Sequence, residues 1–460
     1  MNYVSTRGAA PHLSFEETML AGLARDGGLY VPAEVPVLAP ARIAELAGRP
    51  YEDVALAVMQ PFIGDCFGAA ELKQAIARAY AGFAHPARAP LRQLGPNHFV
   101  QELFHGPTLA FKDFAMQLIG QLFELALKRA GKRVTIVGAT SGDTGSAAIE
   151  AFRGLDSVDV FILFPDGRIS DVQRRQMTTP ADSNVHAIAI DGDFDAAQAR
   201  VKDMFNDFAF RDTVRLAGVN SINWARVLAQ VVYYVTAATS LGAPHRSVSF
   251  TVPTGNFGDI YAGSIARRMG LPIDRLVVAT NRNDILHRAL SSGSYAPQTV
   301  MPTMSPSMDI QVSSNFERAL FDAYDRDGAA IAGLMAGQAG GFEIDARALS
   351  ALRAVFASGQ ASEEQTGATM ARVLKETGVL LCPHSAVGVT VAEAHLDRAP
   401  MVTLATAHPA KFPDAVESAT GVRPQLPPRM SDLFDLPERV THLPDDLAAI
   451  QAFIRERTAD

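Results

Sequence analysis

Apolar and polar positions follow two alternating patterns along most of the chain. Positions 111, 114, 118, 122 and 125 are apolar at intervals of three and four, which predicts a helix that ends at Gly131. Short runs rich in Val, Ile and Phe predict strands at 134–137, 158–164, 185–190, 247–252 and 276–280. Strands that alternate with helices are typical of mostly parallel sheets with helices on both faces. We therefore expect an α/β fold.

The length of the chain and its changes of pattern suggest several parts. A chain of 460 residues exceeds one core, because domains usually hold about 100–200 residues. Prolines break the first part into short helical segments, and a Pro/Ala/Arg-rich stretch at 85–90 reads as a linker. We predict an N-terminal α-rich domain over 1–92, a core over 93–425 with a largely helical insertion at about 300–378, and a tail over 426–460.

Composition and charge argue against several classes of protein. The net charge is −8, whereas a general nucleic-acid binder needs a basic face. Cys66 and Cys382 are the only cysteines, which excludes a disulfide framework and favours a cytoplasmic location. The uncharged stretch 227–244 holds several polar side chains, so we predict a buried helix and no membrane span.

Two glycine-containing loops each lie between a predicted strand and a predicted helix. They span 138–146 and 254–258. Converging backbone N–H groups and the positive end of a helix can hold a phosphate or a carboxylate there. A single loop of this kind is more often a tight turn, but two in one α/β core favour an anionic ligand. Neither loop has a P-loop lysine or a dinucleotide fingerprint, so a nonenzymatic nucleotide-binding module is the weaker alternative.

Lys112 lies between Phe111 and Phe114 at the start of the predicted apolar helix. A lysine desolvated among aromatic rings has a lowered pKa, which favours imine chemistry with a carbonyl. From this segment alone an exposed lysine is the commoner outcome, because most lysines stay exposed. No histidine has a second ligand at metal-binding spacing, and no serine-hydrolase elbow is present, so we predict neither a metal site nor a serine hydrolase.

Taken together, these segments resemble threonine synthase in the long form found in many bacteria and in fungi. The resemblance covers nearly the whole chain, and its most specific runs are Phe-His-Gly-Pro-Thr-Leu-Ala-Phe-Lys-Asp-Phe at 104–114 and Thr-Ala-His-Pro-Ala-Lys-Phe at 406–412. Further matching runs lie at 22–32, 140–145, 189–195, 220–223 and 253–259. The resemblance implies a fold-type II enzyme dependent on pyridoxal 5′-phosphate (PLP), with two α/β lobes, each an open, twisted, mostly parallel sheet flanked by helices.

The resemblance also implies a set of cofactor-binding residues. Lys112 would form the Schiff base with PLP, and Asp143 would lie near the 3′-oxygen of the ring. Thr406 would place its hydroxyl near the pyridine nitrogen, which tempers the electron sink. The cofactor phosphate would be held by the backbone N–H groups of Gly255, Asn256, Phe257 and Gly258.

The substrate implied by the resemblance is O-phospho-L-homoserine. Its carboxylate would bind the loop at Ser141, Gly142 and Thr144. Its phosphate would bind Ser221, Arg226 and Asn256, with Lys411 as a second candidate cation. Trp224 departs from relatives, which often have a smaller residue at this position.

The implied reaction is a γ-elimination of phosphate followed by β-addition of water, which gives L-threonine, with Lys112 moving protons between carbons. The nearest alternative is another fold-type II PLP lyase, such as a serine or threonine dehydratase. A monomer is favoured, with a homodimer as the alternative.

Overall fold

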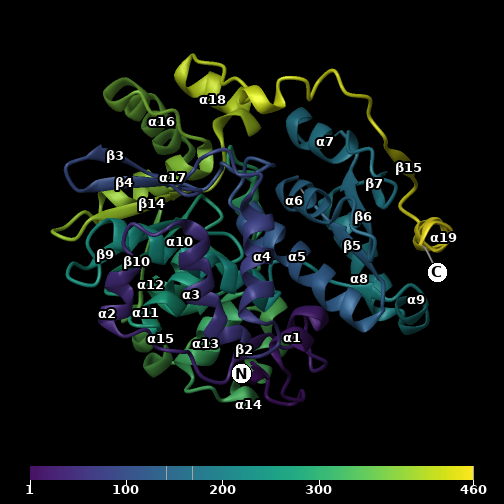
Figure 1. The fold of residues 1–460 in the computed structure, drawn as a ribbon. Helices are drawn as coiled ribbons and strands as arrows, with labels where there is room; N and C mark the ends of the chain where they lie inside the picture. The colour runs from purple at the N-terminus through teal and green to yellow at the C-terminus, as the bar shows by residue number, and fades with distance from the viewer. Residues whose placement is uncertain (141, 168, 459–460) are drawn as a thin grey trace.

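The computed structural model describes residues 1–140, 142–167 and 169–458. Its strands form two large sheets that lie in separate lobes (Figure 1). In the larger sheet the order is β13 (Phe356–Gln360), β10 (Ile273–Thr280), β9 (Val248–Pro253), β14 (Met401–Ala405), β4 (His98–Glu102) and β3 (Leu91–Gly95). In the smaller sheet it is β15 (Thr441–Leu443), β7 (Val185–Ile190), β6 (Val158–Pro165), β5 (Val134–Ala139) and β8 (Leu216–Ala217). Only β3 and β4 pair antiparallel within these sheets of the described chain, so the expected mostly parallel α/β fold is confirmed.

Long helices pack between and around the two sheets. They include α5 (Lys112–Ala130), α10 (Trp224–Ser240) and α11 (Gly258–Arg268), and each of these buries most of its side chains. Helix α10 contains most of the uncharged stretch, and this confirms the predicted buried helix. In the part of the chain that the structure describes, no helix is long and apolar enough to span a bilayer.

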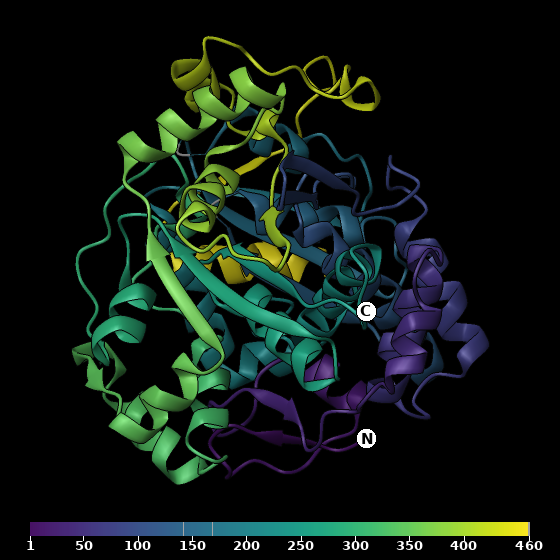
Figure 2. The same ribbon diagram turned by 90° about the vertical axis from the view of Figure 1, so that its left-hand side faces the viewer.

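The N-terminal elements, drawn in purple and dark blue in Figure 1 and Figure 2, pack onto α5 and α10. They include β1 (Tyr3–Ser5), β2 (Tyr30–Pro32), α1 (Phe15–Ala21), α2 (Pro40–Glu45), α3 (Tyr51–Ile63) and α4 (Ala69–Tyr80). The indole Nε1 of Trp224 donates to the hydroxyl of Tyr3 (3.2 Å), and its ring lies beside Tyr3 and Phe62. Trp224 is fully buried, so it joins α10 to the N-terminal elements.

Residues 300–378 are mostly helical, but they also supply an edge strand. The helices are α13 (Phe316–Ala323), α14 (Gly328–Ala336), α15 (Ala346–Arg353) and α16 (Glu363–Thr377). Strand β13 lies between α15 and α16 and pairs parallel with β10 along its whole length. Its sequence, Phe-Ala-Ser-Gly-Gln, has no β-branched residue. Pairing with β10, and not local propensity, therefore makes this segment a strand.

The C-terminal tail crosses from the larger lobe to the smaller one (Figure 1). It leaves α18 (Pro413–Thr420), and Arg429 Nη2 then donates to the carbonyl of Gly106 (2.6 Å). Strand β15 pairs parallel with β7, and α19 (Leu447–Arg457) packs on α8 (Phe194–Asn206). Ile450 and Ile454 are fully buried in the core of the smaller lobe. The tail therefore completes the smaller sheet.

A buried carboxyl joins α10 to α11. Asp259, near the start of α11, accepts hydrogen bonds from the hydroxyls of Tyr233 and Tyr234. Burial raises the pKa of Asp259 from 3.8 to about 7, and the two hydroxyls offset only part of this effect. The folded protein therefore binds a proton at Asp259 more tightly than the unfolded chain does.

We expect Asp259 to make stability depend on pH. The contribution of Asp259 to the free energy of unfolding is fully present below pH 3.8 and is lost as the pH rises through about 7. The reason is that the raised pKa favours the protonated folded state. Asp259→Asn removes this dependence, so the wild-type protein should lose on the order of a few kcal/mol relative to the variant over that range. Thermal unfolding of both proteins at several pH values measures the difference. The exposed Asp65→Asn is the control, and parallel curves for Asp259→Asn and wild type would contradict the expectation.

Candidate active site

Backbone pairing brings Lys112 next to Thr406. The N–H of Phe111 donates to the carbonyl of Thr406 (2.8 Å), and the N–H of His408 donates to the carbonyl of Leu109 (3.0 Å). Lys112 is the first residue of α5, so its side chain leaves the helix at this junction between two distant segments. The two segments are the most family-specific runs of the sequence.

Asp143 connects two lysines at the centre of the site. Its Oδ2 accepts from Lys112 Nζ (3.3 Å), and its Oδ1 lies 2.8 Å from Lys411 Nζ. The amide of Gln173 also donates to Oδ1 (2.9 Å). Burial alone would raise the pKa of Asp143, but Lys411 and Lys112 outweigh it and hold this pKa well below its usual range. Asp143 is therefore a carboxylate at neutral pH.

The ammonium group of Lys112 has a lowered pKa. Burial is the largest cause, and the nearby charges of Lys411 and Arg226 add to it, while Asp143 acts in the opposite direction. The side chain is 12% exposed. A lowered pKa increases the fraction of free amine, which is the form that attacks a carbonyl and accepts a proton. Of the two rings expected from the sequence, Phe111 lies beside the ammonium group, with Nζ 5.2 Å from its ring centre, whereas Phe114 packs on Tyr80 and Tyr233.

Lys411 is fully buried beneath Asp143. Besides Asp143, its Nζ donates to the carbonyl of Thr108 (2.7 Å) and to the side chain of Gln176 (3.1 Å). These three partners match the three donors of an ammonium group. The geometry thus favours Lys411 as a residue that positions Asp143, and its predicted contact with a substrate phosphate stays a prediction.

We expect Lys411→Met to destabilise the fold. The variant breaks the buried ion pair with Asp143 and removes the donor to the Thr108 carbonyl, while Lys112 remains as the one cation beside Asp143. Breaking a buried ion pair typically lowers the free energy of unfolding by about 3–5 kcal/mol. Chemical denaturation measures the loss. The double variant Lys411→Met/Asp143→Asn removes both charges of this pair, so it should regain part of the lost stability. A loss below about 1 kcal/mol in the single variant would contradict the role assigned to the pair.

The loop after β9 forms a cradle for an anion at the start of α11. Within the described chain, the backbone N–H groups of residues 255–258 donate to no protein acceptor. Phe257 has a φ of +65°, and its buried ring packs on Phe316 and Phe356. A Cβ atom at Gly255 would lie 2.9 Å from the carbonyl oxygen of Ser307, so this position needs glycine. Unpaired N–H groups at a helix N-terminus suit the phosphate of PLP.

A segment that the sequence analysis did not anticipate covers this cradle. Ser313 Oγ donates to the carbonyl of Gly255 (2.7 Å), and the N–H of Asn315 donates to the carbonyl of Asn256 (3.0 Å). Ser307 Oγ reaches Asp143 Oδ2 at 3.4 Å. Residues 301–315 are rich in Ser, Pro and Met, a composition that indicates a loop but not its position.

His384 is a further site residue that the sequence analysis did not identify. It is the second residue of α17 (Pro383–Glu393), and its Nε2 accepts a hydrogen bond from the N–H of Ser307 (3.1 Å). Burial lowers its pKa to about 4, so the ring is neutral at physiological pH. The other ring nitrogen, Nδ1, is buried without a partner in the described structure. In the described part of the chain, no group of three or more His, Cys, Asp or Glu side chains is arranged to hold a metal ion.

Arg226 is a buried cation without a carboxylate partner among the described residues. Its side chain is on the first turn of α10, and the one hydrogen bond described for it runs to the carbonyl of Val219 (3.3 Å). Burial lowers the pKa of Arg226 to about 10, so it keeps its charge at neutral pH. Ser221 lies nearby, and its carbonyl accepts from the side chain of Asn315 (3.1 Å). This arrangement suits an anionic ligand.

The loop before α6 (Asp143–Phe152) is held by Thr140. Its Oγ1 accepts from the N–H groups of Gly142 and Gly145, each at 2.9 Å. Gly142 has a φ of +134°, and a Cβ atom there would collide with Gln173. Thr144 is partly exposed, and Ser141 lies outside the described residues.

A lysine with a lowered pKa, a phosphate cradle and two parallel sheets together define a PLP-dependent enzyme of fold type II. The family model "Pyridoxal-phosphate dependent enzyme" matches residues 84–406. "Threonine synthase N terminus" matches 2–80, and "Threonine synthase, C-terminal" matches 385–454. The chain belongs to the threonine synthase family. Because two of these matches overlap, the domain boundaries predicted from the sequence stay predictions.

Individual relatives agree with this assignment. A threonine synthase of Pseudomonas aeruginosa is 54% identical, over 99% of this chain and 98% of that protein. The crystal structure of PLP-bound threonine synthase from Brucella melitensis is 57% identical, with a TM-score of 0.98 and full coverage of both chains. The yeast enzyme has a TM-score of 0.93 at 39% identity, and covers 99% of this chain and 98% of its own. A serine racemase and a threonine deaminase have TM-scores of only 0.50 at 15% and 13% identity, so they share the fold alone.

These findings confirm the family, the fold class and PLP as the cofactor, and they favour the main interpretation over another PLP lyase or a nucleotide-binding module. The roles predicted for single site residues stay predictions.

Proposed function

We propose that the enzyme converts O-phospho-L-homoserine and water into L-threonine and inorganic phosphate. The observation that carries this proposal is the buried guanidinium of Arg226. It has no carboxylate partner in the described chain, and its positive charge is close enough to Lys112 to lower the pKa of that lysine. A substrate with a phosphate group would supply the missing negative charge close to the reacting lysine. A dehydratase acting on free serine or threonine has no use for such a group.

The described residues fit PLP at four points. Lys112 would hold the cofactor, and residues Gly255–Gly258 would bind its phosphate through the unpaired N–H groups of the cradle. Thr406 would face the ring nitrogen, and Asp143 would face the 3′-oxygen. When bound, PLP supplies an electron sink that stabilises negative charge on carbons next to the substrate amino group.

Side chains of this site would carry out proton transfer and would bind the phosphate and the carboxylate of the substrate. The amine of Lys112, favoured by its lowered pKa, takes the proton from Cα of the substrate and delivers protons to other carbons. Arg226, with Ser221 and Asn256, holds the phosphate while the Cγ–O bond breaks. The loop at 141–144 orients the carboxylate, and Ser141, Gly142 and Thr144 are its proposed contacts.

The balance of atoms distinguishes this reaction from simple elimination. Phosphate leaves Cγ, and Cβ loses one proton and gains the hydroxyl of a water molecule. The two protons released from Cβ and from the water are taken up by Cγ and by the departing phosphate. Tight binding of the phosphate by a buried guanidinium keeps the site closed until the water has been added. Premature opening would release 2-oxobutyrate in place of threonine.

An assay of the PLP-loaded protein with O-phospho-L-homoserine tests the proposed function. Phosphate and L-threonine should be released in equal amounts. Release of phosphate with 2-oxobutyrate as the only carbon product would favour the alternative lyase. Absence of any phosphate release would show that O-phospho-L-homoserine is not the substrate.

We also propose a cytoplasmic monomer. Cys66 and Cys382 are free thiols, and Cys382 is buried, which suits a reducing compartment. Sedimentation of the purified protein measures the oligomeric state, and a stable homodimer would contradict this part of the proposal.

A further inference from the structure

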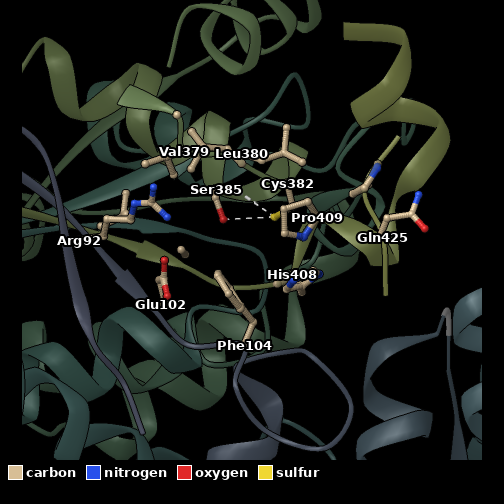
Figure 3. Close-up of a pocket in the computed structure, with 16 residues that line it drawn as sticks. Arg92, Glu102, Phe104, Val379, Leu380, Cys382, Ser385, His408, Pro409 and Gln425 are labelled. Atoms are coloured by element: carbon tan, nitrogen blue, oxygen red, sulfur yellow. Dashed lines mark hydrogen bonds between the residues drawn. The ribbon is translucent and has the colours of Figure 1, made fainter. Parts of the chain in front are cut away.

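A pocket of about 270 Å³ lies behind the segment that holds Thr406 (Figure 3). Ala405, Ala407, His408 and Pro409 line it, whereas Thr406 between them does not. Side chains of an extended segment alternate between two sides, so the pocket and the cofactor site lie on opposite sides of this segment. None of the residues assigned above to PLP or to the substrate lines the pocket. It is therefore a separate cavity.

Two opposite charges line one end of this pocket. Arg92 on β3 pairs in register with Val100 on β4, and Glu102 lies two residues further along β4. This register puts Arg92, Val100 and Glu102 on the same face of the β3–β4 hairpin, and all three line the pocket. Figure 3 shows both charged side chains near one another at the same end.

Arg92 and Glu102 each have polar atoms for which no protein contact is described. Arg92 is exposed, and no ion-pair partner is described for it in the part of the chain that the structure describes. Glu102 is 17% exposed and binds His105 Nε2 through Oε2 (2.8 Å), while no contact is described for its Oε1. A guanidinium and a carboxylate oxygen are thus both available to a ligand. A carboxylate would suit the first, and an ammonium group would suit the second.

The rest of the pocket is mostly apolar. Phe104, Val379, Leu380 and Pro409 surround the space next to the charged end (Figure 3). The volume is slightly below the range of about 300–1,000 Å³ that is typical of sites for drug-sized ligands. The occupant is therefore a small molecule with one apolar part.

We propose that this pocket binds a free amino acid with an apolar side chain. Its α-carboxylate binds Arg92, its α-ammonium binds Glu102, and its side chain lies among Phe104, Val379 and Leu380. A simple fatty acid would leave Glu102 facing an apolar group, and a simple amine would leave Arg92 without a partner. Only a zwitterion with an apolar side chain satisfies both charges and the apolar wall.

Calorimetric titration of the PLP-loaded full chain with L-leucine tests this inference. One equivalent should bind. Leucinamide lacks the carboxylate, and 4-methylpentanoate lacks the ammonium group, so each should bind at least about tenfold more weakly. Arg92→Gln should weaken L-leucine binding by a similar factor. The control Arg25→Gln, an exposed arginine on the N-terminal domain, should leave it unchanged.

Turnover of O-phospho-L-homoserine separates this pocket from the catalytic site. Arg92→Gln should keep the wild-type kcat and KM, which also shows that the variant folds. Binding of L-leucine that survives Arg92→Gln and competes with the substrate would assign the amino acid to the catalytic site and overturn the proposal. Failure of L-leucine, L-methionine and L-phenylalanine to bind would overturn it as well. Neither result depends on which phosphorylated substrate the enzyme uses.

Discussion

Lys112→Ala is expected to lower turnover by at least about 10³-fold, because both covalent attachment of the cofactor and proton transfer at Cα depend on this amine. The same variant should lose the visible absorbance of lysine-bound PLP. The cradle at residues 255–258 remains, so the variant should still bind PLP reversibly. Absorbance spectra before and after dialysis, together with the turnover assay, measure both effects.

Lys132→Ala is the matched control for this experiment. Lys132 is exposed and lies just beyond the other end of α5, so both absorbance and turnover should stay at the wild-type level. Retention of covalent PLP in Lys112→Ala would show that a different lysine holds the cofactor. Lys411 is the nearest described candidate, since it shares Asp143 with Lys112.

Arg226→Met should separate activity from stability. The variant loses the group that binds the substrate phosphate, so kcat/KM should fall by about 10²–10³-fold. Its melting temperature should stay the same or rise. Burial lowers the pKa of Arg226 to about 10, so folding carries a cost for this charge at neutral pH, and the variant removes that cost.

Arg318→Met is the control for the prediction about Arg226→Met. Arg318 is also fully buried with its pKa lowered to about 10, but its donors bind the carbonyls of Tyr30 and Ile222. Its replacement should lower the free energy of unfolding by about 3 kcal/mol or more, because buried carbonyls lose their partners. An equal loss of stability in Arg226→Met would show that Arg226 is structural, and would remove the main support for the proposed substrate.

Strands β5, β6, β7, β9 and β10 were predictable because each contains a buried run of apolar residues. The structure extends 134–137 to Val134–Ala139 and keeps 185–190 unchanged. Strand β13 was not predicted, since its sequence has no β-branched residue and pairing with β10 makes it a strand. Strands β3, β4, β8 and β15 were also not predicted, because they are short or contain polar and exposed positions. Local pattern therefore identified the strands that bury their own apolar runs, and missed those without such a run.

Some parts of the candidate site were likewise recognisable from the sequence, and other parts were not. Lys112 and the cradle at residues 255–258 were recognisable from contiguous motifs. The contacts of Asp143 were not, because Lys411 and Ser307 are distant in sequence and meet it only in the folded chain. The resemblance implied Lys411 as a second candidate cation for the substrate phosphate, which stays a prediction. The structure adds that its buried ammonium group has three protein acceptors, which sequence reasoning did not find. The role of Trp224 also needed the structure, which places it against Tyr3.

The path of the C-terminal tail has a consequence for synthesis on the ribosome. Strand β7 ends at residue 190, but its partner β15 begins only at residue 441. At about 5–20 residues per second, the edge of the smaller sheet stays unpaired for on the order of tens of seconds after β7 has emerged. An exposed edge strand is a template for pairing with other chains. The nascent protein therefore depends on residues translated long after β7, or on a chaperone, to protect this edge of the smaller sheet.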